Sequence, residues 1–112
     1  MRSAAPLLIA RLDDQPGRTV RLLATLANDR RLKIMCLLRA GERSVGDLAD
    51  AVDGSQSMVS QHLARLRREG LVATRREGQS IFYRLAGPRI EALVEALAGV
   101  MLDASERASS WT

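Results

Sequence analysis

Residues 44–72 read SVGDLADAVDGSQSMVSQHLARLRREGLV, and their pattern of caps, turns and apolar residues indicates the architecture of the chain. Ser44 can open a first helix, because Asp47 stands three residues later and completes a variant of the capping box. An Asp–Gly pair then makes a tight turn. Ser55 can cap a second helix, and Gly70 occupies the position that usually follows a helix end. The stretch therefore predicts a helix-turn-helix.

The pattern after this stretch changes from helical to strand-like. Val72–Arg76 and Ser80–Leu85 are short runs rich in β-branched, aromatic and aliphatic residues. Glu77–Gly78 lies between them and is a turn signal. We expect a β-hairpin directly after the helix-turn-helix.

Helices are also predicted on both sides of this unit. Asn28 can cap a buried helix over residues 29–40, and an amphipathic helix over residues 18–27 precedes it. A last helix begins at Pro88, which suits a first helical turn, and runs to about residue 103. The expected fold class is mainly α with a small β-hairpin, a winged helix-turn-helix that forms a homodimer.

Composition places this unit in one small domain. The chain has 112 residues, and its share of charged residues, 27%, is ordinary for a globular protein. No apolar run approaches the ~20 residues that span a bilayer, so no membrane partner is expected. A single cysteine and no recognisable export signal predict a cytoplasmic protein without internal disulfides. We expect a weakly ordered lead over 1–17, the domain over 18–103 and a flexible tail over 104–112.

The second helix of the pair, 55–69, has the surface of a DNA reader. Val59, Leu63 and Leu66 share one helical face and are expected to face the core. The opposite face carries small polar side chains followed by arginines, and no acidic residue occurs between Ser55 and Arg68. Small donors let a helix approach base edges, and arginines reach phosphates. The predicted DNA-binding residues of this helix are Ser55, Gln56, Ser57, Ser60, Gln61, Arg65 and Arg68.

The hairpin, 72–85, adds Arg75, Arg76 and Gln79 to the predicted DNA-binding residues. Cations near a hairpin tip suit contacts with phosphates or with the minor groove. Charged side chains also protect an edge strand from aggregation, and both roles can hold together. The position beside a reading helix favours DNA.

A dimer is predicted because a domain of this size cannot easily cover the apolar faces of two of its helices, the helix over residues 18–27 and the last helix. A two-fold dimer would bury both and set two reading helices about one DNA turn apart, roughly 34–36 Å, on a palindromic operator. The predicted interface residues are Val20, Leu23, Ile90, Leu93, Val94, Leu97 and Met101.

Several linked motifs resemble one family. Asn28–Ile34 is similar to the helix entry, and Ser55–Leu63 to the reading helix, of the arsenic-repressor-like (ArsR/SmtB) bacterial regulators. Gly70–Val72 and Gly78–Tyr83 follow the family's run into the wing, which corresponds to the hairpin over residues 72–85. The resemblance covers roughly residues 20–102. It implies a homodimeric transcriptional repressor that a small inducer releases from double-stranded operator DNA.

The family's usual metal sensors have no counterpart in this sequence. Family members that sense metals through the helix that corresponds to the one after Ser44 carry a Cys-Val-Cys motif. In this sequence Ser44–Asp47 occupies that place, so both thiolates are missing. The last helix offers carboxylates and no histidine. No metal and no cofactor is expected.

Cys36 matches the first cysteine of the family's redox- and sulfide-responsive branch. The second cysteine is absent, and Val100 and Met101 lie near its place, which excludes an intrachain bridge. Cys36 is then either a thiol sensor or, as its apolar helix favours, a core residue. The inducer is unknown, and a constitutive repressor without one is an alternative.

A winged-helix module that binds protein in place of DNA is the main alternative. An enzyme is rejected, because the sequence has no nucleophile–base pair, carboxylate dyad or phosphate-cradling loop. His62, the single histidine, is expected to be packed against the protein rather than to read a base or bind a metal.

Overall fold

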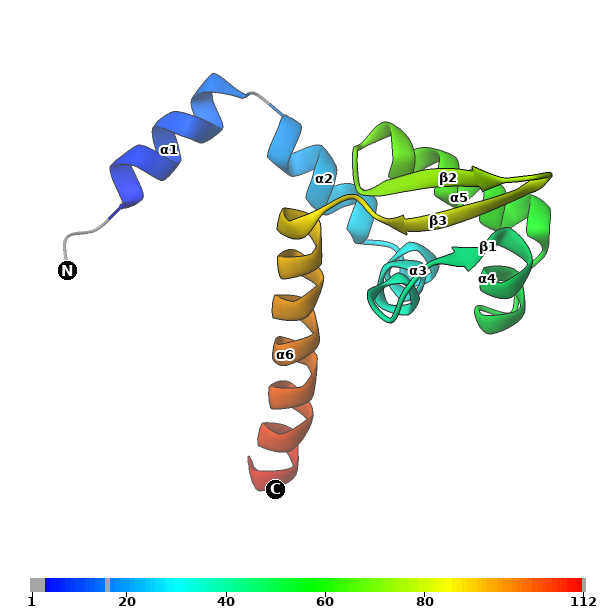
Figure 1. Ribbon diagram of the computed structural model, residues 1–112. Helices are drawn as coiled ribbons and strands as arrows, with labels where there is room; N and C mark the ends of the chain where they lie inside the picture. Colours follow the sequence, from blue (N-terminus) through cyan, green and yellow to red (C-terminus); the bar gives the residue numbers. More distant parts are fainter. Residues whose placement is uncertain (1–3, 16, 112) are drawn as a thin grey trace.

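The computed structural model describes residues 4–15 and 17–111, with side chains as far as residue 102. The described residues form six helices and a three-stranded antiparallel sheet (Figure 1). The elements in chain order are α1 (Ala5–Asp14), α2 (Arg18–Leu26), α3 (Asp29–Arg39), β1 (Arg43–Ser44), α4 (Val45–Ala51), α5 (Gln56–Arg68), β2 (Val72–Glu77), β3 (Ser80–Leu85) and α6 (Pro88–Trp111). The predicted winged helix-turn-helix is confirmed.

The helix starts follow the predicted caps. The side chain of Asn28 accepts a hydrogen bond from the backbone N–H of Arg31 at 3.0 Å. Ser44 caps α4 in the same way, and Ser55 caps α5 by accepting from the N–H of Met58 at 3.1 Å. These bonds satisfy N–H groups that the first helical turn leaves without partners.

The end of α5 is fixed by a glycine with a left-handed backbone. Gly70 has a φ of +74°, and its N–H donates to the carbonyl of Arg67 at 3.0 Å. The N–H of Leu71 reaches back to the carbonyl of Leu66 at 2.9 Å, which completes a Schellman ending. The chain is thereby turned from α5 into β2.

The core lies around α3, which contacts α2, α5, α6 and β3. Ile34 and Met35 of α3 are fully buried. The face of α5 predicted to point inward does so, since Val59, Leu63 and Leu66 are also fully buried. The opposite face of α5 is therefore left on the surface.

The sheet differs from the expected hairpin in two ways. Its order is β1-β3-β2, because the short β1 pairs Arg43 with Tyr83. Two residues are too few to give a strand pattern in the sequence. The turn is also shifted by one residue, since Glu77 pairs with Ser80 and leaves Gly78–Gln79 as the loop. The φ of +63° at Gly78 suits a two-residue hairpin turn.

Helices lie near both ends of the described chain. The lead expected to be weakly ordered contains α1, which has Pro6 in its first turn. None of the α1 side chains is buried in the protomer, so α1 has no buried face whose spacing would predict the helix from the sequence. The last helix, α6, continues to Trp111, whereas the sequence predicted its end near residue 103. Among the described residues no helix is long and apolar enough to cross a membrane.

Candidate nucleic-acid interface

The outward face of α5 is built as the sequence predicted. The inward leucines and valine fix the rotation of the helix, so its polar residues point to solvent. The exposed positions include every residue predicted to bind DNA on this helix, namely Ser55, Gln56, Ser57, Ser60, Gln61, Arg65 and Arg68.

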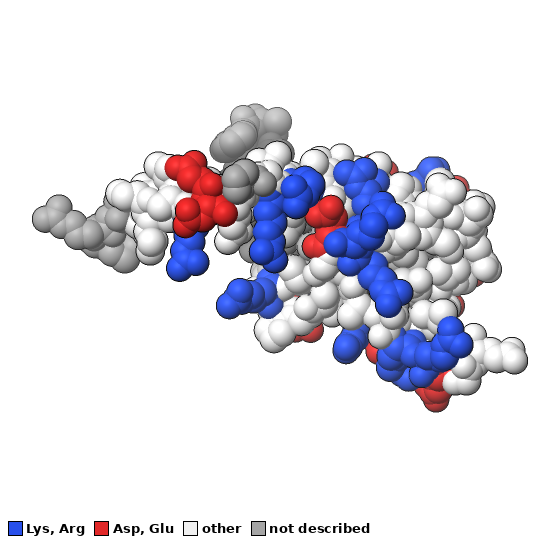
Figure 2. Space-filling model, turned by 90° about the horizontal axis from the view of Figure 1, so that it is seen from above, with Lys and Arg blue, Asp and Glu red and all other residues white. Residues whose placement is uncertain are grey.

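Charge on this helix is divided along its length. The first turn of α5 holds no acidic residue, and its last turn holds Arg65, Arg67 and Arg68. Basic side chains gather in bands across the face seen in Figure 2, with acidic side chains sparse among them. The arrangement gives a neutral, hydrogen-bonding helix start and a positively charged end, which suits base edges and phosphates respectively.

A hollow of about 470 Å3 lies between α5 and the wing. Ser60, Ala64, Arg67 and Arg68 of α5 line one side of it, and Tyr83 of β3 faces them. Sequence reasoning missed Arg67 and Tyr83 as surface residues of this site. Arg67 lies to one side of the face opposite the core, where it lines this hollow, so the apolar spacing of the helix does not single it out.

The wing carries its predicted cations in unequal states. Arg75 Nε lies 2.8 Å from Oε1 of Glu42, and its Nη1 lies 2.8 Å from Oε2 of Glu77. Its guanidinium also lies 4.8 Å from the ring centre of Phe82. Hydrogen bonds to Glu77 and Glu42 raise the pKa of Arg75 above its usual value. Arg75 is therefore held by carboxylates in the unbound protein.

Arg76 and Gln79, the other two predicted wing contacts, are exposed. Arg76 has no ion pair within the part of the chain that the structure describes. Its charge is free to meet an anion, which the charge of Arg75 is not.

A buried arginine supports α5 from beneath, and no sequence feature singled it out. Arg31 is only 8% exposed, and its Nε donates to the backbone carbonyl of Thr25 at 2.6 Å. Burial and the nearby Arg65 lower the pKa of Arg31. Its Nη1 lies 3.4 Å from Nδ1 of His62, which is half-buried as expected. Burial lowers the pKa of His62 first, and the charges of Arg31, Arg30 and Arg65 lower it further.

The residues predicted at a dimer interface fall into three groups. Val20, Leu23 and Met101 are 65%, 56% and 45% exposed, so their side chains are open to a partner. Ile90, Leu93 and Leu97 are half-buried against the core. The expectation that Val94 lies at the interface is corrected, since Val94 is 1% exposed and belongs to the core of its own protomer. It lies one residue from Leu93, and its helical position turns it inward.

Cys36 is a half-buried free thiol rather than a fully buried core residue. It lines a hollow of about 450 Å3 with apolar neighbours that include Leu32, Leu37 and Met101. Among the described residues no group of three His, Cys, Asp or Glu side chains could hold a metal ion.

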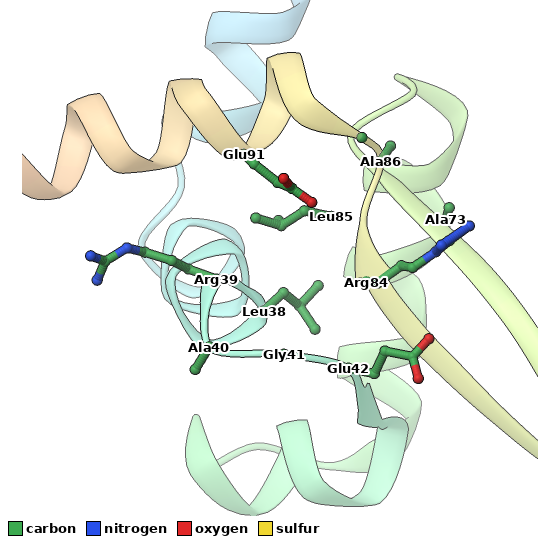
Figure 3. Close-up of a pocket in the computed structure, with 11 residues that line it drawn as sticks. Leu38, Arg39, Ala40, Gly41, Glu42, Ala73, Arg84, Leu85, Ala86 and Glu91 are labelled. Atoms are coloured by element: carbon green, nitrogen blue, oxygen red, sulfur yellow. The ribbon is translucent and has the colours of Figure 1, made fainter.

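A further hollow, of about 430 Å3, lies between the end of α3, the base of the wing and the start of α6 (Figure 3). Leu85 and Glu91 lie close together at one side, and Arg39 points away from Arg84 and Glu42 (Figure 3). Arg39 instead pairs with Glu95 of α6. Acidic and basic side chains are mixed in this lining, in contrast to the arginine-rich surface beside α5.

Comparison with known proteins decides the family. The model of the arsR family of bacterial regulatory proteins matches residues 28–74. The transcriptional activator HlyU of Vibrio cholerae is 45% identical over 93 residues, which cover 83% of this chain and 86% of that protein. The chain belongs to the ArsR family. This ArsR-family chain is thus a transcriptional regulator, and the resemblance predicted from its motifs is confirmed.

Other relatives and solved structures agree with the family and the fold. The biofilm growth-associated repressor of Agrobacterium fabrum is 50% identical to this ArsR-family chain over 76 residues, 68% of this chain and 65% of that one. The structure of reduced HlyU from Vibrio cholerae matches with a TM-score of 0.73 at 44% identity, covering 80% and 95% of the two chains. The homodimeric winged helix-turn-helix DNA-binding domain of Mb0332 from Mycobacterium bovis matches with a TM-score of 0.76 at 32% identity, covering 96% and 93%.

Proposed function

We propose that this regulator is a homodimer that represses transcription by binding a palindromic operator through α5 and the wing. The outward face of α5 carries the proposal. It joins exposed serines and glutamines to exposed arginines without an acidic residue, whereas a merely solvated helix usually mixes both signs of charge. Its location on DNA would place the protein in the cytoplasm.

Gln61 and Ser57 are proposed to read base edges in the major groove, with Ser55, Gln56 and Ser60 beside them. Arg65 and Arg68 are proposed to hold phosphates, as are Arg76 and Gln79 of the wing. Arg75 is proposed to join them only when it leaves its carboxylate partners.

Apolar surface supports the homodimer. Val20 and Leu23 of α2 and Met101 of α6 stay exposed in one protomer, which costs free energy in water. Helix α1 adds Leu7, Leu8, Ile9 and Leu12 to the exposed apolar side chains. A second copy of the chain would cover the exposed side chains of Val20, Leu23 and Met101 and double the DNA contacts.

Repression is proposed because an operator-bound dimer blocks the polymerase without needing a further partner. The relatives are named both ways, as an activator in Vibrio cholerae and as a repressor in Agrobacterium fabrum. Cys36 is the proposed thiol of any redox response, since it is half-exposed beside an apolar hollow. A peroxide or polysulfide effect on operator binding that Cys36→Ser abolishes would support that role, and identical responses would remove it.

The decisive experiment selects bound duplexes from a random pool with the purified full chain. We expect a palindrome whose half-sites are about one DNA turn apart, roughly 34–36 Å. Gln61→Ala should relax base preference at one position per half-site, while Arg11→Ala on α1 should leave the selected sequence unchanged. If no sequence is enriched and duplex binding is weak, the protein-binding winged-helix module is the better description.

A further inference from the structure

A second basic hollow lies away from the wing, where α2, the end of α5 and the start of α6 meet. Its volume is about 670 Å3. The basic residues that line it are Arg18 and Arg21 of α2, Arg68 of α5 and Arg89 of α6. Four guanidinium groups from three separate helices thus surround one space.

Negative charge at this hollow is too small to balance the arginines. Glu69 is the acidic residue of the lining, and its Oε2 lies 3.9 Å from Nε of Arg21. The pair is long and the Arg21 side chain is 62% exposed, so the interaction is weak. Within the described residues, Arg18, Arg68 and Arg89 have no ion pair.

The backbone adds positive charge to the same place. Helix α2 begins after Gly17, whose φ is +75°, and no side chain caps its first N–H groups. The lining also includes Thr19 in that first turn, as well as Arg89 and Ile90 in the first turn of α6. Two helix starts therefore border the hollow, where the positive ends of their dipoles add to the charge of the arginines.

Arg21 makes the imbalance more acute. A Cβ built on Gly17 would lie 3.3 Å from Nη1 of Arg21, so this guanidinium lies over the start of its own helix. A cation at the positive end of a helix is unfavourable unless an anion shares the place. A planar guanidinium pairs with phosphate oxygens through two parallel hydrogen bonds, and several such groups bind a phosphate strongly.

We propose that the hollow of Arg18, Arg21, Arg68 and Arg89 binds a phosphate group. Arg68 also lines the hollow beside the wing, so the site is continuous with the face of α5 that is proposed to bind DNA. The phosphate is then either a backbone diester of DNA outside the bases read by α5, or the phosphoryl group of a small free molecule. The site is an addition to the proposed operator contacts and does not depend on which bases α5 reads.

The experiment uses the full chain with Arg18→Ala and Arg89→Ala, alone and together, because both residues lie outside α5 and the wing. Arg11→Ala is the matched control, since it removes the same charge from exposed α1 outside the hollow. Circular dichroism and light scattering establish that each variant keeps its fold and its oligomeric state. One arm measures binding to a random-sequence duplex over a range of salt, and the other titrates inorganic pyrophosphate against a chloride control.

If a DNA phosphate occupies the hollow, the double substitution lowers the slope of log affinity against log salt by up to about 0.9, the value for one phosphate, and each single substitution lowers it by less. Between about 50 and 200 mM salt the wild type then loses up to roughly threefold more affinity than the double variant. If a free phosphorylated molecule is the ligand, the salt slope stays as in the wild type and pyrophosphate binding falls at least tenfold in the double variant. The proposal is overturned if the hollow variants match Arg11→Ala in both arms.

An Arg65→Ala variant separates this proposal from the proposed function. A flatter salt slope for Arg65→Ala with wild-type behaviour of both hollow variants leaves DNA binding by α5 intact and rejects the hollow. Loss of pyrophosphate binding in the hollow variants, with no duplex binding by the wild type, keeps the hollow and rejects the operator.

Discussion

Nη1 of Arg31 in α3 lies 3.4 Å from Nδ1 of His62 in α5. The same guanidinium donates through Nε to the carbonyl of Thr25 in α2. One buried cation thus joins the helix proposed to read DNA to two helices of the scaffold. Because Arg31 can only donate, Nδ1 of His62 accepts only while it is unprotonated.

Replacing the buried arginine tests its structural role. Arg31→Met keeps an unbranched side chain but leaves the Thr25 carbonyl without its partner, so we expect a loss of about 1–3 kcal/mol in the free energy of unfolding. Urea denaturation measures it. Arg30→Met on the same helix is the control, because Arg30 is exposed and its loss should cost well under about 1 kcal/mol. Equal losses for the two variants would contradict the proposed role of Arg31.

The lowered pKa of His62 predicts that acid destabilises the protein. Burial and the charges of Arg31, Arg30 and Arg65 favour the neutral imidazole in the folded state, so the unfolded chain binds a proton more readily. The penalty is absent at pH values well above the usual pKa of 6.5 and grows as the pH falls through it toward the lower pKa of the folded state.

The measurement is the free energy of unfolding from about pH 7.5 to about pH 5.5. His62→Asn, which keeps a hydrogen-bond acceptor but has no titrating ring, should lose less stability over this interval than the wild type. Parallel pH curves for the two proteins would show that His62 has no share in the acid sensitivity.

The sequence predicts those features of the structure that depend on local capping bonds or on the spacing of buried apolar residues. Asn28, Ser44 and Ser55 cap helices by local bonds, and the apolar spacing of α5 fixes which face is exposed, so these features were predictable. The partners of Arg75 and Arg31 were not, because Glu42 is 33 residues from Arg75 and His62 is 31 residues from Arg31. A cation at the surface and one in the core look alike in a sequence.

Alanine substitutions at Gly70 and Gly54 distinguish the stability cost of backbone strain from the cost of steric crowding. Gly70→Ala places a Cβ in open space but at a φ of +74°, so we expect a cost of about 1 kcal/mol from backbone strain. At Gly54 the added Cβ would collide with Cε of Met58, and φ is not positive. The flexible Met58 side chain can move away, so Gly54→Ala should cost less than Gly70→Ala. Thermal melting of both variants gives the order, and the reverse order would refute this explanation.

The wing arginines should differ in their share of DNA binding. Glu42 and Glu77 already hold Arg75, whereas Arg76 has no ion pair in the described chain. Arg76→Ala should therefore lower the salt slope of duplex binding by close to the ~0.9 expected for one phosphate, and Arg75→Ala by less. The double substitution Glu42→Gln with Glu77→Gln provides the complementary variant, because it removes both carboxylate partners of Arg75 and should steepen the slope. A larger effect of Arg75→Ala than of Arg76→Ala would show that the carboxylates give way when DNA binds.

The exposed side chains of α2 test the homodimer. Val20 and Leu23 are 65% and 56% exposed in one protomer, so a polar substitution there costs the protomer little. At a two-fold interface each change occurs twice, and Leu23→Glu sets two carboxylates in an apolar contact. We expect sedimentation velocity to show a monomer for Leu23→Glu at micromolar concentration, with the circular dichroism of the wild type. Ile81→Glu is the control, since Ile81 is 39% exposed on the wing and should leave the dimer intact. Dissociation by both variants, or by neither, would place the interface elsewhere than on α2.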